Sequence, residues 1–117
     1  MTCCLLFSGA VLSQKIPLIR SGEIITKAIQ LYDSGKYPES IREFLTVPKR
    51  DTNYVYMLSE LSLAYVANEE NDMAVKVCEE GLQEPSTFRA HMMRTKAIAT
   101  DHKGDFEEAV KLFQKCI

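Results

Sequence analysis

The sequence SGKYPESIREF at residues 34–44 recurs in outline as KGDFEEAVKLF at residues 103–113. Each copy has a glycine, then an aromatic residue, an acidic residue, a small residue and an aliphatic residue. A weaker copy, EENDMAVKVC at residues 69–78, keeps the small and the aliphatic residues without the glycine or the aromatic residue. The small residues are Ser40, Ala74 and Ala109, which lie 34 and 35 residues apart. This interval indicates an internal repeat.

A second amphipathic stretch precedes each copy. Its large, small and medium-sized residues follow one another at spacings of four and three, which places them on one face of a helix. They are Ile24, Ala28 and Leu31, then Leu58, Ser62 and Tyr65, then Met93, Ala97 and Thr100. The repeating unit is therefore predicted to be a pair of helices, and the whole chain to be all-α. We expect the helices at about residues 21–34, 37–47, 53–68, 72–83, 87–101 and 105–117.

The residues between these stretches are typical of helix ends. Gly35 and Gly104 supply the left-handed residue that often ends a helix. Asp105, with a glutamate three residues later, has the spacing of a capping box. Pro48 and Pro85 are expected to close the second helices of the first two units.

A helix-turn-helix unit of 34 residues, with a small residue in each helix and Gly-x-aromatic at the turn, resembles the tetratricopeptide repeat. The resemblance covers residues 21–117 and implies a right-handed α-solenoid of about three repeats, at 21–54, 55–88 and 90–117, the last incomplete. Unit one departs from the pattern at Val47-Pro48, where the second helix normally runs longer, and unit two lacks the turn glycine. The small sites, where the two helices of each unit would touch, are Ala28 and Ser40, Ser62 and Ala74, and Ala97 and Ala109.

In this family the first helices line a concave side that binds partners. Members that hold a C-terminal carboxylate use Lys and Asn there, because a carboxylate needs charged donors. Here only Arg94 offers such a donor, so we expect an apolar or amphipathic segment of a protein partner instead. Alternatively, some of these residues pack against a capping helix or an N-terminal arm at residues 14–20. The resemblance places in this groove Ile25, Ile29 and Tyr32, then Ser59, Leu63 and Val66, then Arg94, Ile98 and Asp101.

Chemistry-bearing patterns are sparse. His91 and His102 lie about 16 Å apart on one predicted helix at 1.5 Å per residue, too far to share a metal. Cys78 and Cys116 have no metal-ligand spacing and are expected to be buried, inert thiols. The formal charge is −2, and its 14 basic and 16 acidic residues are scattered, which argues against nucleic acid. We expect no enzyme activity, cofactor or metal.

Residues 3–12 form an uncharged, largely apolar run, shorter than the roughly 20 residues that span a bilayer. The run has the size of a signal-peptide core, followed by the small residue Ser13. We therefore expect a signal peptide at residues 1–13 and export to the periplasm or cell surface of a bacterium. No basic residue precedes the run, so the alternative is an apolar N-terminal helical turn packed on a cytoplasmic domain. Intact-mass data on secreted material should show a species beginning near Gln14, and retention of residues 1–13 would refute export.

These observations favour a non-catalytic scaffold that holds a peptide or partner subunit in an apolar groove. The alternative is an accessory region of a larger enzyme or signalling protein whose active part lies beyond the C-terminus. Val110, Phe113 and Ile117 form an apolar face on the last predicted helix. A solenoid would cover this face, so we expect either a longer repeat protein or a homo-oligomer through the C-terminal helix.

Overall fold

The computed structural model describes residues 20–116, and the regular secondary structure in this range is entirely helical. The predicted all-α class is confirmed, and each expected helix is present. The predicted signal peptide, most of the predicted arm and Ile117 lie outside the described residues. The helices are α2 (Ser21–Asp33), α3 (Tyr37–Phe44), α4 (Tyr54–Ala67), α5 (Asn71–Gly81), α6 (Arg89–His102) and α7 (Phe106–Lys115).

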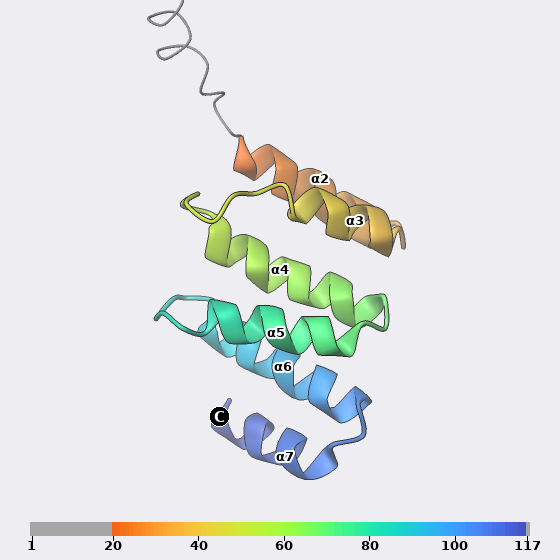
Figure 1. Ribbon diagram of the computed structural model, residues 1–117, viewed down its shortest axis with the longest axis vertical. Coiled ribbons are helices and arrows are strands. Elements are labelled where there is room, and N and C mark those ends of the chain that lie inside the picture. The colour runs from red at the N-terminus through yellow and green to blue at the C-terminus, as the bar shows by residue number, and fades with distance from the viewer. Residues whose placement is uncertain (1–19, 117) are drawn as a thin grey trace, which may run out of the picture.

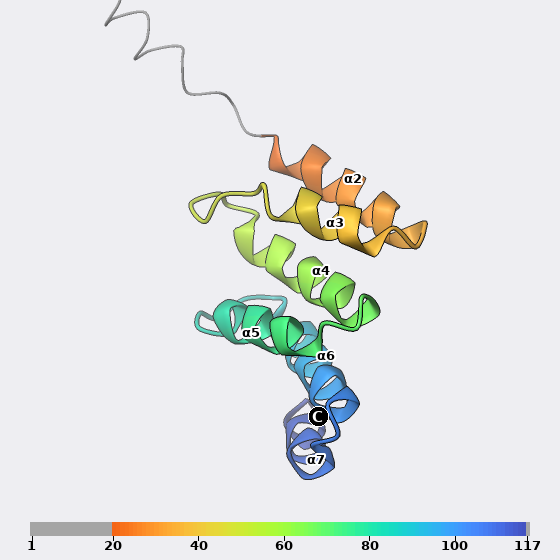
Figure 2. The same cartoon turned by 45° about the vertical axis from the view of Figure 1, so that its right-hand side comes forward.

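The helices follow one another along the long axis of an elongated molecule of 68 × 31 × 20 Å (Figure 1). Consecutive helices run in opposite directions and pack against each other. Following the sequence repeat, α2 with α3 is unit one, α4 with α5 is unit two, and α6 with α7 is unit three. The first helices also pack together, α2 on α4 and α4 on α6. Figure 2 shows α2 and α3 from the side but α7 nearly end-on, so the units are rotated relative to one another.

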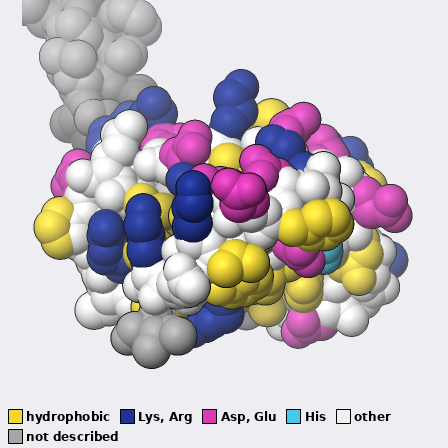
Figure 3. All heavy atoms as spheres, turned by 90° about the horizontal axis from the view of Figure 1, so that it is seen from below, with side chains coloured by type: hydrophobic (Ala, Val, Ile, Leu, Met, Phe, Trp, Pro, Cys, Tyr) yellow, Lys and Arg dark blue, Asp and Glu magenta, His cyan; other side chains and the backbone are white. Residues whose placement is uncertain are grey.

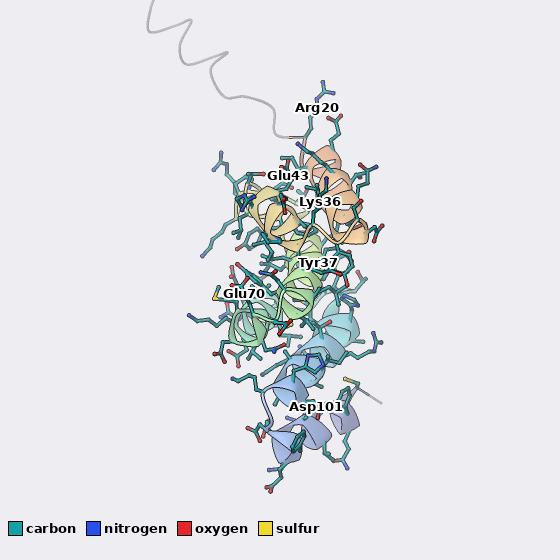
Figure 4. The ribbon with its side chains drawn as sticks, turned by 90° about the vertical axis from the view of Figure 1, so that its right-hand side faces the viewer. Arg20, Lys36, Tyr37, Glu43, Glu70 and Asp101 are labelled. Carbon is teal, nitrogen blue, oxygen red and sulfur yellow. The ribbon has the colours of Figure 1, made fainter. Side chains whose placement is uncertain are left out.

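The turns inside the three units have the same backbone geometry. Gly35 and Gly104 have positive φ angles of 78° and 89°, as predicted. Glu69 occupies the same repeat position in unit two and has a φ of 61°, although its side chain makes this conformation unfavourable. After each of these residues, one amide bonds back across the turn: Lys36 N to Leu31 O (2.9 Å), Glu70 N to Tyr65 O (2.8 Å) and Asp105 N to Thr100 O (3.2 Å). The turns lie on the side that faces the viewer in Figure 4, where Lys36 and Glu70 are labelled.

The helix crossings are built on the predicted small residues. All six are buried, with at most 1% of their surface exposed. In unit one, the Ser40 hydroxyl donates a hydrogen bond of 2.7 Å to the Ala28 carbonyl across the crossing. Small side chains let the helix backbones approach closely enough for this contact.

The core continues from unit one into unit two. Ile41 and Phe44 on α3 are buried in the same hydrophobic cluster as Leu58, Leu61 and Tyr65 on α4. One helix pair cannot bury both of its apolar faces alone, so the apolar face of α3 depends on α4 for its burial.

Helix α3 ends at Phe44, earlier than the predicted residue 47. Pro48 disfavours the helical conformation for Val47, and the chain leaves the helix through a tight turn in which Val47 N bonds to Phe44 O (3.1 Å). The connection to α4 is tied to the start of α2, because the Ser21 hydroxyl donates to Asp51 Oδ1 at 2.7 Å. The Asn53 amide group donates to Ser21 Oγ at 3.0 Å.

Candidate protein-binding surfaces

The predicted groove residues lie on α2, α4 and α6, the helices that pack side by side. Ile29, Leu63 and Ile98 occupy one repeat position, 34 and 35 residues apart, and all three are half-buried. Tyr32 and Val66, which share another repeat position, are half-buried as well. We call these five residues the first-helix strip. They present apolar surface from three helices that contact each other.

Ile25 and Ser59 were also predicted to line the groove, and the structure corrects this placement. Each is only 1% exposed, so neither offers surface to a partner. Both lie on helices against which the next first helix packs, α4 beside α2 and α6 beside α4. Arg94 has the same repeat position on α6 and is exposed. No further first helix follows α6 in the described part of the chain.

The strip ends in polar residues at α6. Arg94 and Asp101 are both exposed, and Asp101 is labelled at the turn side of the molecule in Figure 4. The predicted polar residues of the lining thus lie exposed on α6, while Ile98 on the same helix is half-buried.

Glu60 adds a carboxylate that the sequence analysis missed. It is half-buried and is the only charged residue of α4, with the sequence YVYMLSELSLAYVA. A single acid in such an apolar helix was the signal that could have revealed it. Burial raises the pKa of the Glu60 carboxyl; nearby His91 lowers it and Asp33 raises it further. No ion pair involving Glu60 is present within residues 20–116.

Tyr32 and His91, which lie near Glu60, are also partly buried. The pKa of Tyr32 is raised, first by burial and then by the nearby Tyr37, Asp33 and Glu60. His91 Nε2 is buried and has no hydrogen-bond partner among the described residues. Glu60 is thus a half-buried acid close to one member of the apolar strip.

A second concave surface lies between residues 45–49, which follow α3, and helix α5, with α4 as its floor; we call it the α3–α5 cleft. This cleft has a volume of about 520 Å³. The sequence analysis did not predict it, although Val47-Pro48 was the signal: because α3 ends early, residues 45–49 line the cleft in place of a longer helix. Its apolar lining consists of Leu45, Val47, Pro48, Met57, Leu58, Leu61, Met73 and Val77, with Tyr54 and Tyr65.

Polar groups line one end of this cleft. The Tyr54 hydroxyl donates a hydrogen bond of 2.6 Å to Glu80 Oε2, which joins α4 to α5. Burial and this bond raise the pKa of Tyr54 to about 12. Lys49 Nζ lies 3.9 Å from the same carboxylate oxygen. The cleft could therefore accept an apolar side chain beside a fixed polar rim.

Among the described residues, no group of three or more His, Cys, Asp or Glu side chains could hold a metal ion. Cys78 has no exposed surface, and burial raises the pKa of its thiol to about 11. Cys116 is half-buried, and its thiol donates to Leu112 O at 3.4 Å. Within residues 20–116, every helix is too short or too polar to cross a lipid bilayer.

No protein-family model matches this chain.

Proposed function

We propose that this chain is a non-catalytic helical-repeat protein of the tetratricopeptide type, which binds a segment of another protein along the first-helix strip. The observation that carries the proposal is the alignment of Ile29, Leu63 and Ile98. These residues recur at one repeat position on three helices that pack together, and all three keep exposed surface. Apolar side chains that recur along a row of helices suit an extended or helical apolar segment.

Two features of the helix packing support a curved solenoid with the strip on its inner side. The first helices approach each other, α2 to α4 and α4 to α6. In contrast, the Cα atoms of α3 and α5 stay more than 8 Å apart, as do those of α5 and α7. A stack whose first helices are closer than its second helices bends toward the first helices, and its concave side is the usual binding side in such repeats. The right-handed sense is taken from the resemblance to tetratricopeptide repeats.

Glu60 indicates which residue types the bound segment contains. A half-buried carboxylate is stabilised by a cation that reaches it in a poorly hydrated site. We therefore propose that the bound segment carries apolar residues and at least one Lys or Arg. The exposed Arg94 on α6 is free to meet an acidic group of the same segment, since none of the ion pairs among the described residues involves it.

The test is selection of binders from a random dodecapeptide library displayed on phage, with the full chain as bait. Enriched peptides should combine two or more large apolar residues with a basic residue. Binding of the synthetic peptides, measured by fluorescence anisotropy, should fall at least tenfold in Leu63→Glu.

Leu45→Glu is the matched control, because Leu45 is 56% exposed and lies at the α3–α5 cleft. Its affinity should stay within about twofold of the parent chain. Loss of binding in Leu45→Glu but not in Leu63→Glu would move the site to the cleft and overturn the assignment to the strip. Loss of helical circular dichroism in Leu63→Glu would identify Leu63 as a core residue.

A second variant tests the basic residue of the partner. Glu60→Gln should weaken binding of the selected basic peptides severalfold, and the loss should shrink as salt increases. Peptides in which norleucine replaces the basic residue should bind the parent and Glu60→Gln equally. If the basic peptides bind the parent chain and Glu60→Gln with equal affinity, Glu60 is not part of the binding site.

A further inference from the structure

Exposed apolar side chains are concentrated at two places on the described part of the chain. Three of the five large hydrophobic side chains that are exposed there belong to α7, at the end where Figure 3 shows hydrophobic side chains on the surface. The other two are Leu45, which is 56% exposed, and Met73, which is 37% exposed. Both line the α3–α5 cleft, Leu45 from the segment after α3 and Met73 from α5. The cleft therefore has an apolar edge on each side.

The repeat shows that these apolar edges are particular to the cleft. In the other two units, the repeat positions of Leu45 and Met73 carry polar residues that are exposed. These residues are Glu79 and Gln114 for Leu45, and Glu39 and Glu108 for Met73. Packing of the helix pairs thus leaves both positions in contact with water and does not require an apolar residue at either.

The depth of the cleft decides what kind of molecule can occupy it. Its floor includes Met57, Leu58 and Leu61, which belong to the core and are at most 2% exposed. The exposed apolar surface is therefore at the two edges. A small ligand is normally enclosed over about 70–90% of its surface, which a shallow cleft does not provide. Such a cleft suits large apolar side chains of a segment whose backbone stays outside.

Lys76 is a positive group of the cleft without an acidic partner. The charged residues of the lining are Lys49, Lys76 and Glu80, two cations and one anion. The Glu80 carboxylate already accepts the hydrogen bond from Tyr54 and lies beside Lys49. None of the ion pairs among the described residues includes Lys76.

The other acidic residues of α5 are also engaged by cations other than Lys76. Asp72 Oδ1 lies 2.7 Å from Lys103 Nζ, and Glu79 Oε2 lies 3.3 Å from Lys96 Nζ. Beyond the Tyr54–Glu80 bond, a separate hollow of about 260 Å³ is lined by Glu80 and Glu84 but not by Lys76. The side of the cleft at Lys76 is therefore the one that attracts an anion.

We propose that the α3–α5 cleft is a second protein-binding site, which takes an amphipathic segment of a partner in which large apolar residues are adjacent to Asp or Glu. The apolar residues pack between Leu45 and Met73, and the acidic residue pairs with Lys76. The cleft uses Leu58 and Leu61 of α4, whereas the first-helix strip uses other residues of that helix. The two sites can therefore be occupied at once, and this proposal does not rest on the strip.

The test is a selection from a random dodecapeptide library displayed on phage, with the immobilised full chain as bait. The double variant Leu45→Gln with Met73→Gln, present in excess in solution, removes peptides that bind elsewhere on the chain. The remaining peptides should combine large apolar residues with Asp or Glu. Their affinity, measured by fluorescence anisotropy of the synthetic peptides, should fall at least tenfold in the double variant. Its helical circular dichroism should be unchanged, because both side chains are more than one-third exposed.

Substitutions of Lys76 test the acidic residue of the partner. Lys76→Gln should weaken binding severalfold, with a loss that shrinks as salt increases, and Lys76→Arg should bind like the parent. The matched control is Arg42→Gln. Arg42 has the same repeat position on α3, is exposed and joins no ion pair among the described residues, but it does not line the cleft. Its variant should stay within about twofold of the parent, as should the strip variant Leu63→Glu.

Four results would overturn the proposal. The first is a selection that enriches no acidic apolar peptides, and the second is equal affinity of these peptides for the parent and the double variant. Peptides that lose affinity in Leu63→Glu but not in the double variant bind the strip, which would leave only the proposed function standing. Displacement of the peptides by laurate that binds more tightly than they do would assign the cleft to a long-chain carboxylate. A dimer of the parent chain in sedimentation equilibrium that the double variant abolishes would assign it to a second copy.

Discussion

Unit one and unit two share the same arrangement of two helices and a turn, although their residues differ at most equivalent positions, three of which are informative. At the helix crossing, unit one has Ser40 and unit two has Ala74. At the turn, unit one has Gly35 and unit two has Glu69. In the middle of the first helix, unit one has Thr26 and unit two has Glu60, and the two members of each pair are 34 residues apart. The comparison teaches that packing of the helices imposes the backbone of the repeat, and that these side chains adjust how stable each unit is.

The largest expected effect is at the crossing of unit two. Ala74 is fully buried where α5 meets α4, and Ala74→Leu would insert a larger side chain into a filled space. We expect a loss of about 1–3 kcal/mol in the free energy of unfolding, measured by urea denaturation. Lys76→Leu is the control, since this residue of the same helix is exposed, and it should change stability by less than about 0.5 kcal/mol. An unchanged midpoint for Ala74→Leu would contradict a close crossing.

The hydroxyl at the crossing of unit one gives the next effect. Ser40→Ala removes a buried hydrogen bond of 2.7 Å between two helices and should cost about 1 kcal/mol in the free energy of unfolding. Ser62→Ala in unit two should cost less than about 0.5 kcal/mol, because Ser62 donates to Ser59 O within its own helix and alanine favours the helix. Equal losses in the two variants would mean that the bond between helices contributes nothing specific.

A stabilising change is expected at the turn of unit two. Glu69→Gly relieves a left-handed conformation that costs a residue with a side chain about 1–2 kcal/mol, although glycine also gains freedom in the unfolded chain. The net expectation is a gain of about 0.5 kcal/mol, seen as a higher thermal midpoint. The neighbouring Glu70 has a φ of −104°, so Glu70→Gly should give no gain. A loss of stability in Glu69→Gly would show that the Glu69 side chain contributes more than the backbone strain costs.

The smallest effect concerns Glu60 and depends on pH. The pKa of Glu60 is raised in the folded protein, so the folded state favours its neutral form. The stability that this form contributes is present at low pH and is lost as the pH rises through the folded-state pKa. Glu60→Gln should therefore stabilise the protein at pH 7, by less than about 0.5 kcal/mol because the side chain is only half-buried, and should change little at pH 3. Thermal melts of both proteins at the two pH values measure this, and a larger gain at pH 3 would contradict the direction.

Local patterns were sufficient to predict the helices and their pairing. The spacing of Ala28, Ser62 and Ala97 within apolar stretches located the first helices, and Gly35 and Gly104 located two of the three turns. These signals act within one or two helical turns, so they can be read without knowing what packs nearby. For the same reason, the six small residues predicted for the crossings are all buried.

The candidate site was predicted less well. Leu63 and Ile98 keep exposed surface, whereas Ile25 and Ser59 are buried. Exposure at these positions depends on how closely one first helix packs on the next, which no pattern within a single helix records. The α3–α5 cleft also depends on the segment after α3 and on helix α5, which are distant in the sequence.

The sequence by itself determined the helical class, the repeat of 34 and 35 residues and the small residues at the crossings, because helix periodicity and helix ends are local properties. Only the tertiary structure decided three other features: the left-handed Glu69, the burial of Ile25 and Ser59, and the α3–α5 cleft. Each of them depends on how neighbouring helices pack. Glu69 holds its unfavourable conformation because the helices on both sides are fixed by packing, and the cleft forms because residues 45–49 and α5 come together over α4.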